Sequence, residues 1–165
     1  MYSYLIDSIF AHIYADRSRF EMAAIIERML PSAKPGKTIT TVHNYINYYD
    51  FIIRKGAIAS YAGELMVIPF NMEDGLLICE GKSNKAWNCS APHGAGRLLA
   101  RNAAKKLLDV EAAKASLKEK GVFASVVPVD ETKGAYKSAE IIEQAVQPTA
   151  SVVTRVRPVF NIKAK

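Results

Sequence analysis

The spacing of apolar residues predicts that the 165-residue chain opens with a helix. From Tyr2 to Leu30 these residues recur at intervals of three and four, which is the period of one helix face. Pro31 and the pair Pro35-Gly36 follow, and they predict that the helix ends there. His12 lies within the pattern, where packing or surface exposure explains it more simply than a role as a ligand.

After this helix the period changes to that of short strands. Apolar, β-prone runs occupy residues 51–53, 65–68 and 76–79. Further along, the pattern predicts a strand over 122–129, a helix over 138–147 with Ser138 as its N-cap, and a strand pair or extended tail over 151–162.

A long helix is predicted between these strands. The segment from Gly94 to Lys120 is rich in Ala, Leu and Lys, and Gly121 is expected to close it. Because strands and helices do not alternate regularly, the chain is expected to adopt an α+β fold with mixed sheets rather than a doubly wound sheet.

Composition narrows the class of protein. Half of the residues are hydrophobic and 23% are charged, as in a folded globular domain, and no run approaches the length of a membrane span. Cys79 and Cys89 are the only cysteines, so a disulfide framework is not expected and the cytoplasm is the expected compartment. The net charge of +6 suggests a polyanionic partner such as RNA or a nucleotide, at about even odds on charge alone.

One histidine has neighbours that suit chemistry on phosphate. His93 follows Pro92 and precedes Gly94 and Gly96, which leave room for a ligand near the backbone. At the predicted helix N-terminus, a partial positive charge would favour both a bound phosphate and the neutral imidazole that attacks phosphorus. A glycine-rich helix entry with an incidental histidine explains the same residues, and the chemistry alone leaves both interpretations open.

Two further features are weaker. Arg97 and Arg101 are four residues apart, so on the predicted helix they would share one face and hold phosphates. His43 and Asn44 could supply a metal ligand and a nucleotide hydrogen bond, although on chemistry alone a capping or turn role explains this common pair more simply.

Six short motifs follow one another along the chain: HNY at His43, IIRKGAI over 52–58, IPFNMEDG over 68–75, SAPHGAGR over 90–97, GAYKS around Tyr136, and RVRP before Lys163. In this order they resemble the RtcB-type RNA ligases, GTP-dependent enzymes that join RNA ends in tRNA splicing and repair. SAPHGAGR is the most specific motif, and its combination with RKGAI argues against chance.

The resemblance implies an RtcB-like catalytic fold, a reaction and a set of site residues. A histidine takes GMP from GTP with the help of manganese and passes it to an RNA 3′-phosphate, which can arise from a 2′,3′-cyclic phosphate, and a 5′-hydroxyl then displaces the GMP. By motif match His93 is the nucleophile and His43 a manganese ligand. The expected GTP contacts are Asn44, Pro69, Phe70, Asn71, Met72, Gly94, Ala95, Gly96, Tyr136 and Lys163. Lys55, Arg97 and Arg101 are expected to contact phosphates of the RNA ends.

The chain also departs from the family. The aspartate, the cysteine and two further histidines that complete the metal site come from a preceding half, so residues 1–165 resemble a C-terminal half, with a helical lead-in over 1–30 and a nucleotide-binding core over 40–165. A missing N-terminal half or another copy of the chain is therefore an expected partner, besides RNA ends. The alternative is a truncated or degenerate remnant that binds nucleotide or RNA without turnover.

Smaller departures lie within the motifs. Phe70 stands where the family has a glycine, and Leu76 and Ala100 stand where it usually has serines. Glu73 adds a negative charge to the expected nucleotide loop, in a direction that the sequence does not define.

Overall fold

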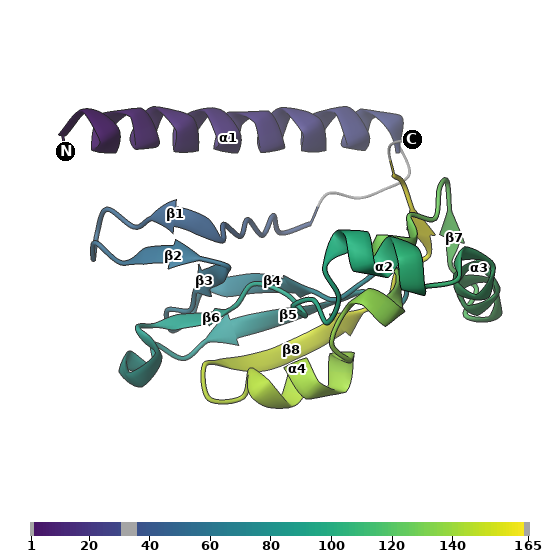
Figure 1. Ribbon diagram of the computed structural model, residues 1–165. Helices are drawn as coiled ribbons and strands as arrows, with labels where there is room; N and C mark the ends of the chain where they lie inside the picture. Colours follow the sequence, from purple (N-terminus) through teal and green to yellow (C-terminus); the bar gives the residue numbers. More distant parts are fainter. Residues whose placement is uncertain (1, 31–35, 164–165) are drawn as a thin grey trace.

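The computed structural model describes residues 2–30 and 36–163 (Figure 1). Its first element is the helix α1, Tyr2–Met29, which lies along one side of the remaining chain, next to the strand β1. The helical spacing therefore predicted this element correctly. Pro31 and Pro35, which were expected to end it, lie outside the described residues. No helix in the described part of the chain is both long and apolar enough to cross a bilayer.

A three-stranded antiparallel sheet supports the centre of the fold. It consists of β4 (Leu65–Pro69), β5 (Leu76–Gly81) and β8 (Ala150–Val156), with β5 in the middle. Alternate residues of β4 and β5 are buried, Ile68 and Leu77 completely. The helix α4 (Ala139–Ala145) contributes Ala139 and Ile142 to the same hydrophobic core. The core thus fixes the hairpin that connects β4 to β5.

Two small antiparallel ladders accompany this sheet, and the first of them lies between α1 and the sheet (Figure 1). The first pairs β1 (Asn44–Ile46) with β2 (Ile53–Lys55), and the second pairs β3 (Ala57–Ala59) with β6 (Ser90–Pro92). Gly56 alone separates β2 from β3, and its φ of +67° is a left-handed conformation that favours glycine. The chain therefore turns sharply at Gly56 as it passes from one ladder to the next.

Short helices and a parallel strand pair complete the fold. The α-helices are α2 (Arg101–Leu107) and α3 (Val110–Glu119), and the 3-10 helices are η1 (Lys85–Trp87), η2 (Val129–Glu131) and η3 (Lys133–Ala135). The strands β7 (Phe123–Ala124) and β9 (Phe160–Asn161) pair in parallel. Met72, Leu117 and Val122 form a second, smaller core under α3. These helices and small sheets confirm the expected α+β class.

The single long helix predicted over 94–120 is wrong. Gly96 has a φ of +68°, and the N–H of Ala95 donates to the carbonyl of Pro69 at 3.0 Å, so this backbone is held by tertiary contacts rather than by helical ones. A second break follows α2, where Leu108 is extended and Asp109 caps α3 by accepting from the N–H of Glu111.

Other local predictions are confirmed or shortened. Gly121 closes α3 with a φ of +69°, and the Ser138 hydroxyl accepts from the N–H of Ile141 at the start of α4. The strand expected over 122–129 is reduced to the two residues of β7.

Candidate functional site

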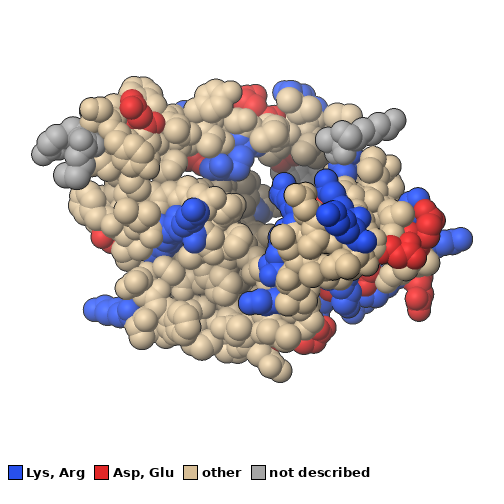
Figure 2. Space-filling model, in the orientation of Figure 1, with Lys and Arg blue, Asp and Glu red and all other residues tan. Residues whose placement is uncertain are grey.

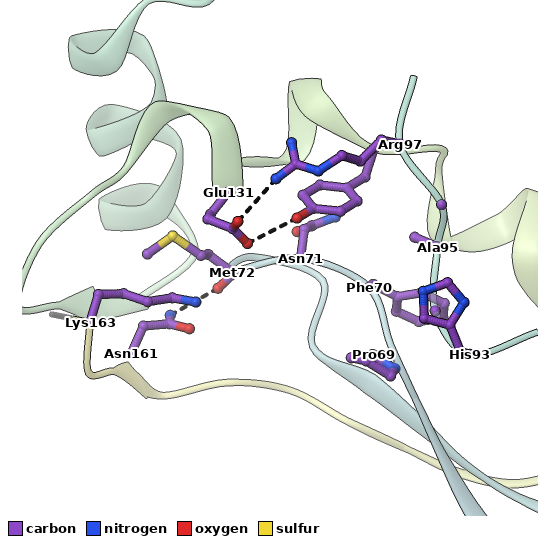
Figure 3. A pocket seen from close by; sticks show the side chains of 13 residues that line it. Pro69, Phe70, Asn71, Met72, His93, Ala95, Arg97, Glu131, Asn161 and Lys163 are labelled. Atoms are coloured by element: carbon purple, nitrogen blue, oxygen red, sulfur yellow. Dashed lines mark hydrogen bonds and ion pairs between the residues drawn. The ribbon is translucent and has the colours of Figure 1, made fainter. Parts of the chain in front are cut away.

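A cavity of about 550 Å³ opens beside the hairpin between β4 and β5 (Figure 3). Three other segments contribute to its wall: the loop after β6, the region of η2 and η3, and the chain around β9. The lining residues are Pro69, Phe70, Asn71, Met72, His93, Gly94, Ala95, Gly96, Arg97, Glu131, Tyr136, Asn161 and Lys163. All residues expected to contact GTP, except Asn44, therefore lie around one cavity.

Hydrogen bonds within the hairpin hold the loop of the cavity, residues 69–75. The side-chain oxygen of Asn71 accepts from the N–H groups of Glu73 and Asp74, both at 2.9 Å, and the N–H of Phe70 donates to the carbonyl of Gly75 at 2.8 Å. Gly75 has a φ of +79°, and a β-carbon there would lie 2.0 Å from the carbonyl oxygen of Val156. This loop therefore has one defined conformation.

Glu73 and Asp74 point away from the cavity, toward the basic side chains behind the hairpin. The Glu73 carboxylate pairs with Lys120 and accepts from the Ser116 hydroxyl at 2.8 Å. Burial by itself raises the pKa of Asp74, but the Asn71 hydrogen bond and the charge of Lys133 together bring that pKa below its ordinary value. The negative charge that the sequence added to this loop is thus neutralised outside the nucleotide-sized space.

His93 lies directly after a strand, so the expected helix N-terminus is absent from its backbone. β6 pairs with β3 so that Pro92 faces Ala57, and this register brings the His93 ring next to Gly56. The ring Nδ1 lies 2.6 Å from the Gly56 carbonyl oxygen. Since a carbonyl only accepts, Nδ1 carries a proton, and the lone pair of the neutral ring is on Nε2. A main-chain carbonyl, rather than a helix dipole, orients this imidazole.

His93 also lies at a second cavity, which has a volume of about 390 Å³. Arg19 and Phe20 of α1 line this second cavity together with His43. The rings of His43 and His93 are 4.9 Å apart between centroids, with 38° between their planes. The two histidines singled out in the sequence are therefore neighbours.

The glycines after His93 let the backbone approach the end of β4. A β-carbon at Gly94 would lie 3.0 Å from the carbonyl oxygen of Pro69, whereas the space beside Gly96 is open. Ala95 is buried between them. This stretch, residues 94–96, presents main chain rather than side chains to the cavity.

Arg97 is engaged by two acidic residues of η2. It donates to the Asp130 carbonyl at 2.8 Å and to the Glu131 carboxylate at 3.0 Å, and its guanidinium lies 4.8 Å from the centre of the Tyr136 ring. Arg101 begins α2 and is exposed, so the two arginines do not share a helix face.

Glu131 also accepts from the Tyr136 hydroxyl, at 2.9 Å (Figure 3). Burial and this hydrogen bond raise the pKa of Tyr136 to about 12, so the phenol remains protonated and donates to Glu131 near neutral pH. Nothing in the sequence pattern indicated Glu131, because its role in the cavity depends on contacts with distant residues.

Lys163 and Asn161 lie at the end of the cavity opposite His93 (Figure 3). The Asn161 amide donates to the Met72 carbonyl at 2.9 Å, and the backbone N–H of Lys163 donates to the Ser125 hydroxyl at 2.9 Å. These bonds fix the last described residues of the chain, Asn161 against the hairpin loop and Lys163 against the residue that follows β7. Asn161, like Glu131, was missed by the sequence analysis.

Three expected site residues lie away from the 550 Å³ cavity, besides His43. Asn44 directs its side-chain oxygen to the N–H of Gly56, at 3.0 Å, while Lys55 and Arg101 are exposed. Figure 2 shows Lys and Arg side chains gathered over α2, beside a hollow beneath α1. The exposed cations of α2 are Arg101, Lys105 and Lys106. None of these three cations lines the cavity.

No group of three or more metal-ligating side chains forms within residues 2–30 and 36–163. His43 and His93 supply two imidazoles at most, fewer than the usual number of protein ligands for a divalent transition metal. Cys79 is buried in the core, and burial raises the pKa of its thiol to about 11. The described residues therefore form no complete metal site.

Comparison with known proteins identifies the family. The family model described as tRNA-splicing ligase RtcB matches residues 1–164. The chain belongs to the RtcB family. It is 30% identical over 139 residues to the RNA-splicing ligase RtcB of Escherichia coli strain K12, an alignment that covers 81% of this chain and 34% of that protein. The RNA-splicing ligase RtcB1 of Escherichia coli strain ATCC 25922 gives the same identity and coverage.

The RtcB assignment confirms the family that the six motifs indicated. The chain spans about a third of the length of these RtcB relatives. Within this RtcB chain, the motif residues lie mainly around the cavity at the β4–β5 hairpin and around the His43–His93 pair.

Proposed function

We propose that this chain is the nucleotide-binding and guanylyl-transferring part of an RNA ligase. In this proposal residues 40–165 form the core and residues 1–30 the helical lead-in of one domain. The observation that carries the proposal is the position of His93, whose ring lines a nucleotide-sized cavity and contacts the Gly56 carbonyl through Nδ1, so that Nε2 is the nitrogen left for attack. A volume of about 550 Å³ is within the range of small-molecule sites.

The two ends of the cavity match the two ends of GTP. Guanine presents N–H donors next to a carbonyl oxygen, which complement the carboxylate of Glu131 and the ammonium of Lys163. At the other end, the main chain of residues 94–96 leaves room for phosphates beside His93. A nucleotide bound in this direction would bring its α-phosphate toward His93.

The proposed reaction proceeds in three transfers. The Nε2 lone pair of His93 attacks the α-phosphorus of GTP, a P–N bond forms, the bond to the β-phosphate oxygen breaks, and pyrophosphate leaves. An oxygen of an RNA 3′-phosphate next attacks the same phosphorus, which transfers GMP to the RNA and frees His93. An RNA 5′-hydroxyl then attacks the activated 3′-phosphate, GMP leaves, and a phosphodiester remains.

RNA ends are expected to bind over the basic surface outside the cavity. Arg101, Lys105 and Lys106 on α2 are exposed, and no acidic residue lies on this helix. Lys55 is exposed close to Gly56 and would reach a phosphate beside His93. Such contacts neutralise phosphate charge without reading sequence, as a ligase for diverse ends requires. Arg97 is held by Asp130 and Glu131, and its proposed contact with RNA would require one of these pairs to open.

The described residues do not complete a manganese site, so no step of the proposal passes through metal. His43 faces the second cavity beside α1 and is the residue most able to contribute an imidazole. We propose that the missing ligands come from outside this chain, either from an N-terminal half of the ligase or from another copy.

The surface of α1 supports a partner at this position. The side of α1 away from β1 exposes large apolar residues, among them Ile6, Phe10 and Ile13. Phe10 is 69% exposed, whereas Ile68 of β4 and Leu77 of β5 are fully buried. A row of apolar side chains beside an incomplete metal site is typical of an interface.

The second candidate function is binding without turnover. The incomplete metal site favours this second function, because the cavity can hold GTP without the imidazole of His43 and without a complete set of metal ligands. In that case the chain would bind nucleotide or RNA phosphates and would form no covalent intermediate.

Labelling with GTP that carries a radioactive α-phosphate tests the proposal. The purified chain is incubated with this GTP and manganese, first alone and then with an added N-terminal half of an RtcB ligase. Label that stays on the denatured protein but is released by acid, as a P–N bond requires, is the expected result, reduced to background by His93→Ala and retained by His12→Ala. His12 is the matched control because it packs against Tyr45 and Tyr48 and does not line the cavity. GTP binding with no label in either condition would favour the second function.

A further inference from the structure

We propose that Asn44 is a positioning residue that fixes the tautomer of His93 through the backbone of Gly56. The inference rests on the proposed function, because it concerns the ring assigned as the nucleophile. By motif match Asn44 was expected to contact GTP, but its side chain does not line the 550 Å³ cavity. Its hydrogen bond leads toward His93 instead.

The hydrogen bonds at Gly56 connect the two residues. The N–H of Gly56 is shared between the His43 carbonyl, at 2.8 Å, and the Asn44 side-chain oxygen, at 3.0 Å. The carbonyl of the same glycine accepts from Nδ1 of His93 at 2.6 Å. Asn44, Gly56 and His93 thus form one continuous chain of contacts.

The strand registers explain why these contacts coincide at Gly56. β1 pairs with β2 so that Asn44 faces Lys55, and β3 pairs with β6 so that Ala57 faces Pro92. Gly56 is the single residue between the two ladders, with one ladder on its N–H side and the other on its carbonyl side. Because its φ is +67°, rotation at this residue would turn the carbonyl away from His93.

Asn44 therefore restrains the direction of the Gly56 carbonyl. Gly56 and Asn44 are both exposed, so packing contributes little to holding this turn. The His43 carbonyl alone leaves the Gly56 N–H with one acceptor, and the second acceptor from Asn44 narrows its orientation. As long as the carbonyl points at Nδ1, the ring keeps its proton there and presents the Nε2 lone pair.

Two substitutions separate this role from a direct contact with nucleotide. Asn44→Asp keeps an oxygen that accepts from the Gly56 N–H, but it replaces the amide donor with negative charge that repels a triphosphate. Asn44→Ala removes the acceptor. A residue that only contacts nucleotide would leave the tautomer of the nucleotide-free protein unchanged in both variants.

The experiment is nitrogen-15 NMR of the histidine side chains, in the chain without nucleotide or metal, at a pH where the imidazoles are neutral. His93→Ala assigns the His93 signals. The wild-type chain and Asn44→Asp are expected to show the Nδ1-protonated tautomer. Asn44→Ala is expected to shift the tautomer ratio about five-fold toward Nε2 protonation, the effect of losing one neutral hydrogen bond. Asn102→Ala, at an exposed asparagine of α2, is the matched control and is expected to match the wild type.

An unchanged ratio in Asn44→Ala, with thermal unfolding like that of the wild type, would overturn the inference. The readout needs no GTP, so it remains decisive even if the wild-type chain takes up no label. Conversely, label on the wild type with no tautomer change in Asn44→Ala would leave the proposed function intact and remove only the role of Asn44.

Discussion

The cavity and α1 are held by the rest of the molecule in different ways. At the cavity, polar side chains find internal partners, glycines bring backbones close, and the wall rests on the β4–β5–β8 core. α1 contacts the remaining chain through contacts that include the hydrogen bond from Tyr48 to Ser8 and the packing of His12, and it exposes large apolar side chains such as Phe10. The cavity to which we assign the nucleotide is therefore built by this chain, whereas α1 has a surface suited to a partner.

Truncation of a core side chain and of an α1 side chain should give the largest contrast. Leu77→Ala is expected to cost about 4 kcal/mol of unfolding free energy, because Leu77 is fully buried in the central sheet. Phe10→Ala is expected to change it by less than about 0.5 kcal/mol, because Phe10 is exposed on α1. Denaturant titration measures both. A large loss in Phe10→Ala would show that α1 is already covered, for example by self-association of the chain.

The hairpin loop should respond strongly to a single methyl group. In Gly75→Ala the new β-carbon would meet the Val156 carbonyl, so the expected cost is about 2 kcal/mol more than that of Gly63→Ala. Gly63 is the matched control, because it also has a positive φ, of +82°, but no atom near its added β-carbon. Equal costs, measured by denaturant titration, would mean that the loop moves freely relative to β8.

Removing the charge of Glu131 should weaken GTP binding without unfolding the cavity. Glu131→Gln is expected to lower GTP affinity about ten-fold and to leave ATP affinity unchanged, because guanine presents two adjacent donors, N1–H and N2–H, to this carboxylate and adenine lacks that pair. Asp130→Asn is the matched control, since Asp130 also pairs with Arg97 but does not line the cavity. Calorimetric titration of both nucleotides is the measurement. Equal losses for GTP and ATP would contradict the proposed direction of the nucleotide.

The smallest expected effect is on the pH dependence of the free energy of unfolding, to which Asp74 contributes. The pKa of Asp74 is lowered in the folded chain, so the stability that it contributes is present above its unfolded pKa and is lost as pH falls through its folded pKa. The free energy of unfolding of the wild type should therefore fall more steeply below about pH 4 than that of Asp74→Asn. Parallel curves in acid denaturation would contradict this ion-pair arrangement.

The local features of the fold were readable from the sequence. Apolar spacing predicted α1, the Ser138 cap predicted the start of α4, and Gly121 predicted the end of α3, because each depends on neighbouring residues. The motifs also indicated most of the residues around the cavity. The loop over 94–100 was taken for helix because composition shows helix propensity but does not show the tertiary bond from Ala95 to Pro69.

The remaining parts of the site depend on residues that are distant in the chain. Glu131 enters the cavity because Arg97 and Tyr136 hold it, and no pattern near Glu131 announces those partners. The direction of the Asn44 side chain likewise depends on the turn at Gly56. Motifs indicated which residues gather, whereas the three-dimensional contacts define which atoms face one another.

The close fit of Gly75 against β8 restricts how the loop of the cavity, residues 69–75, can change over evolutionary time. Phe70, Glu73 and Leu76 differ in type from the residues expected in the family, and the packed hairpin accommodates all three. An insertion or deletion that changed the pairing of the two strands would instead shift β4 against β5. A shift of one residue would turn Leu77 and Cys79 toward the opposite face of the sheet. Descendants of this chain can therefore exchange side chains at positions such as 70, 73 and 76, but they inherit Gly75 and the length of the loop.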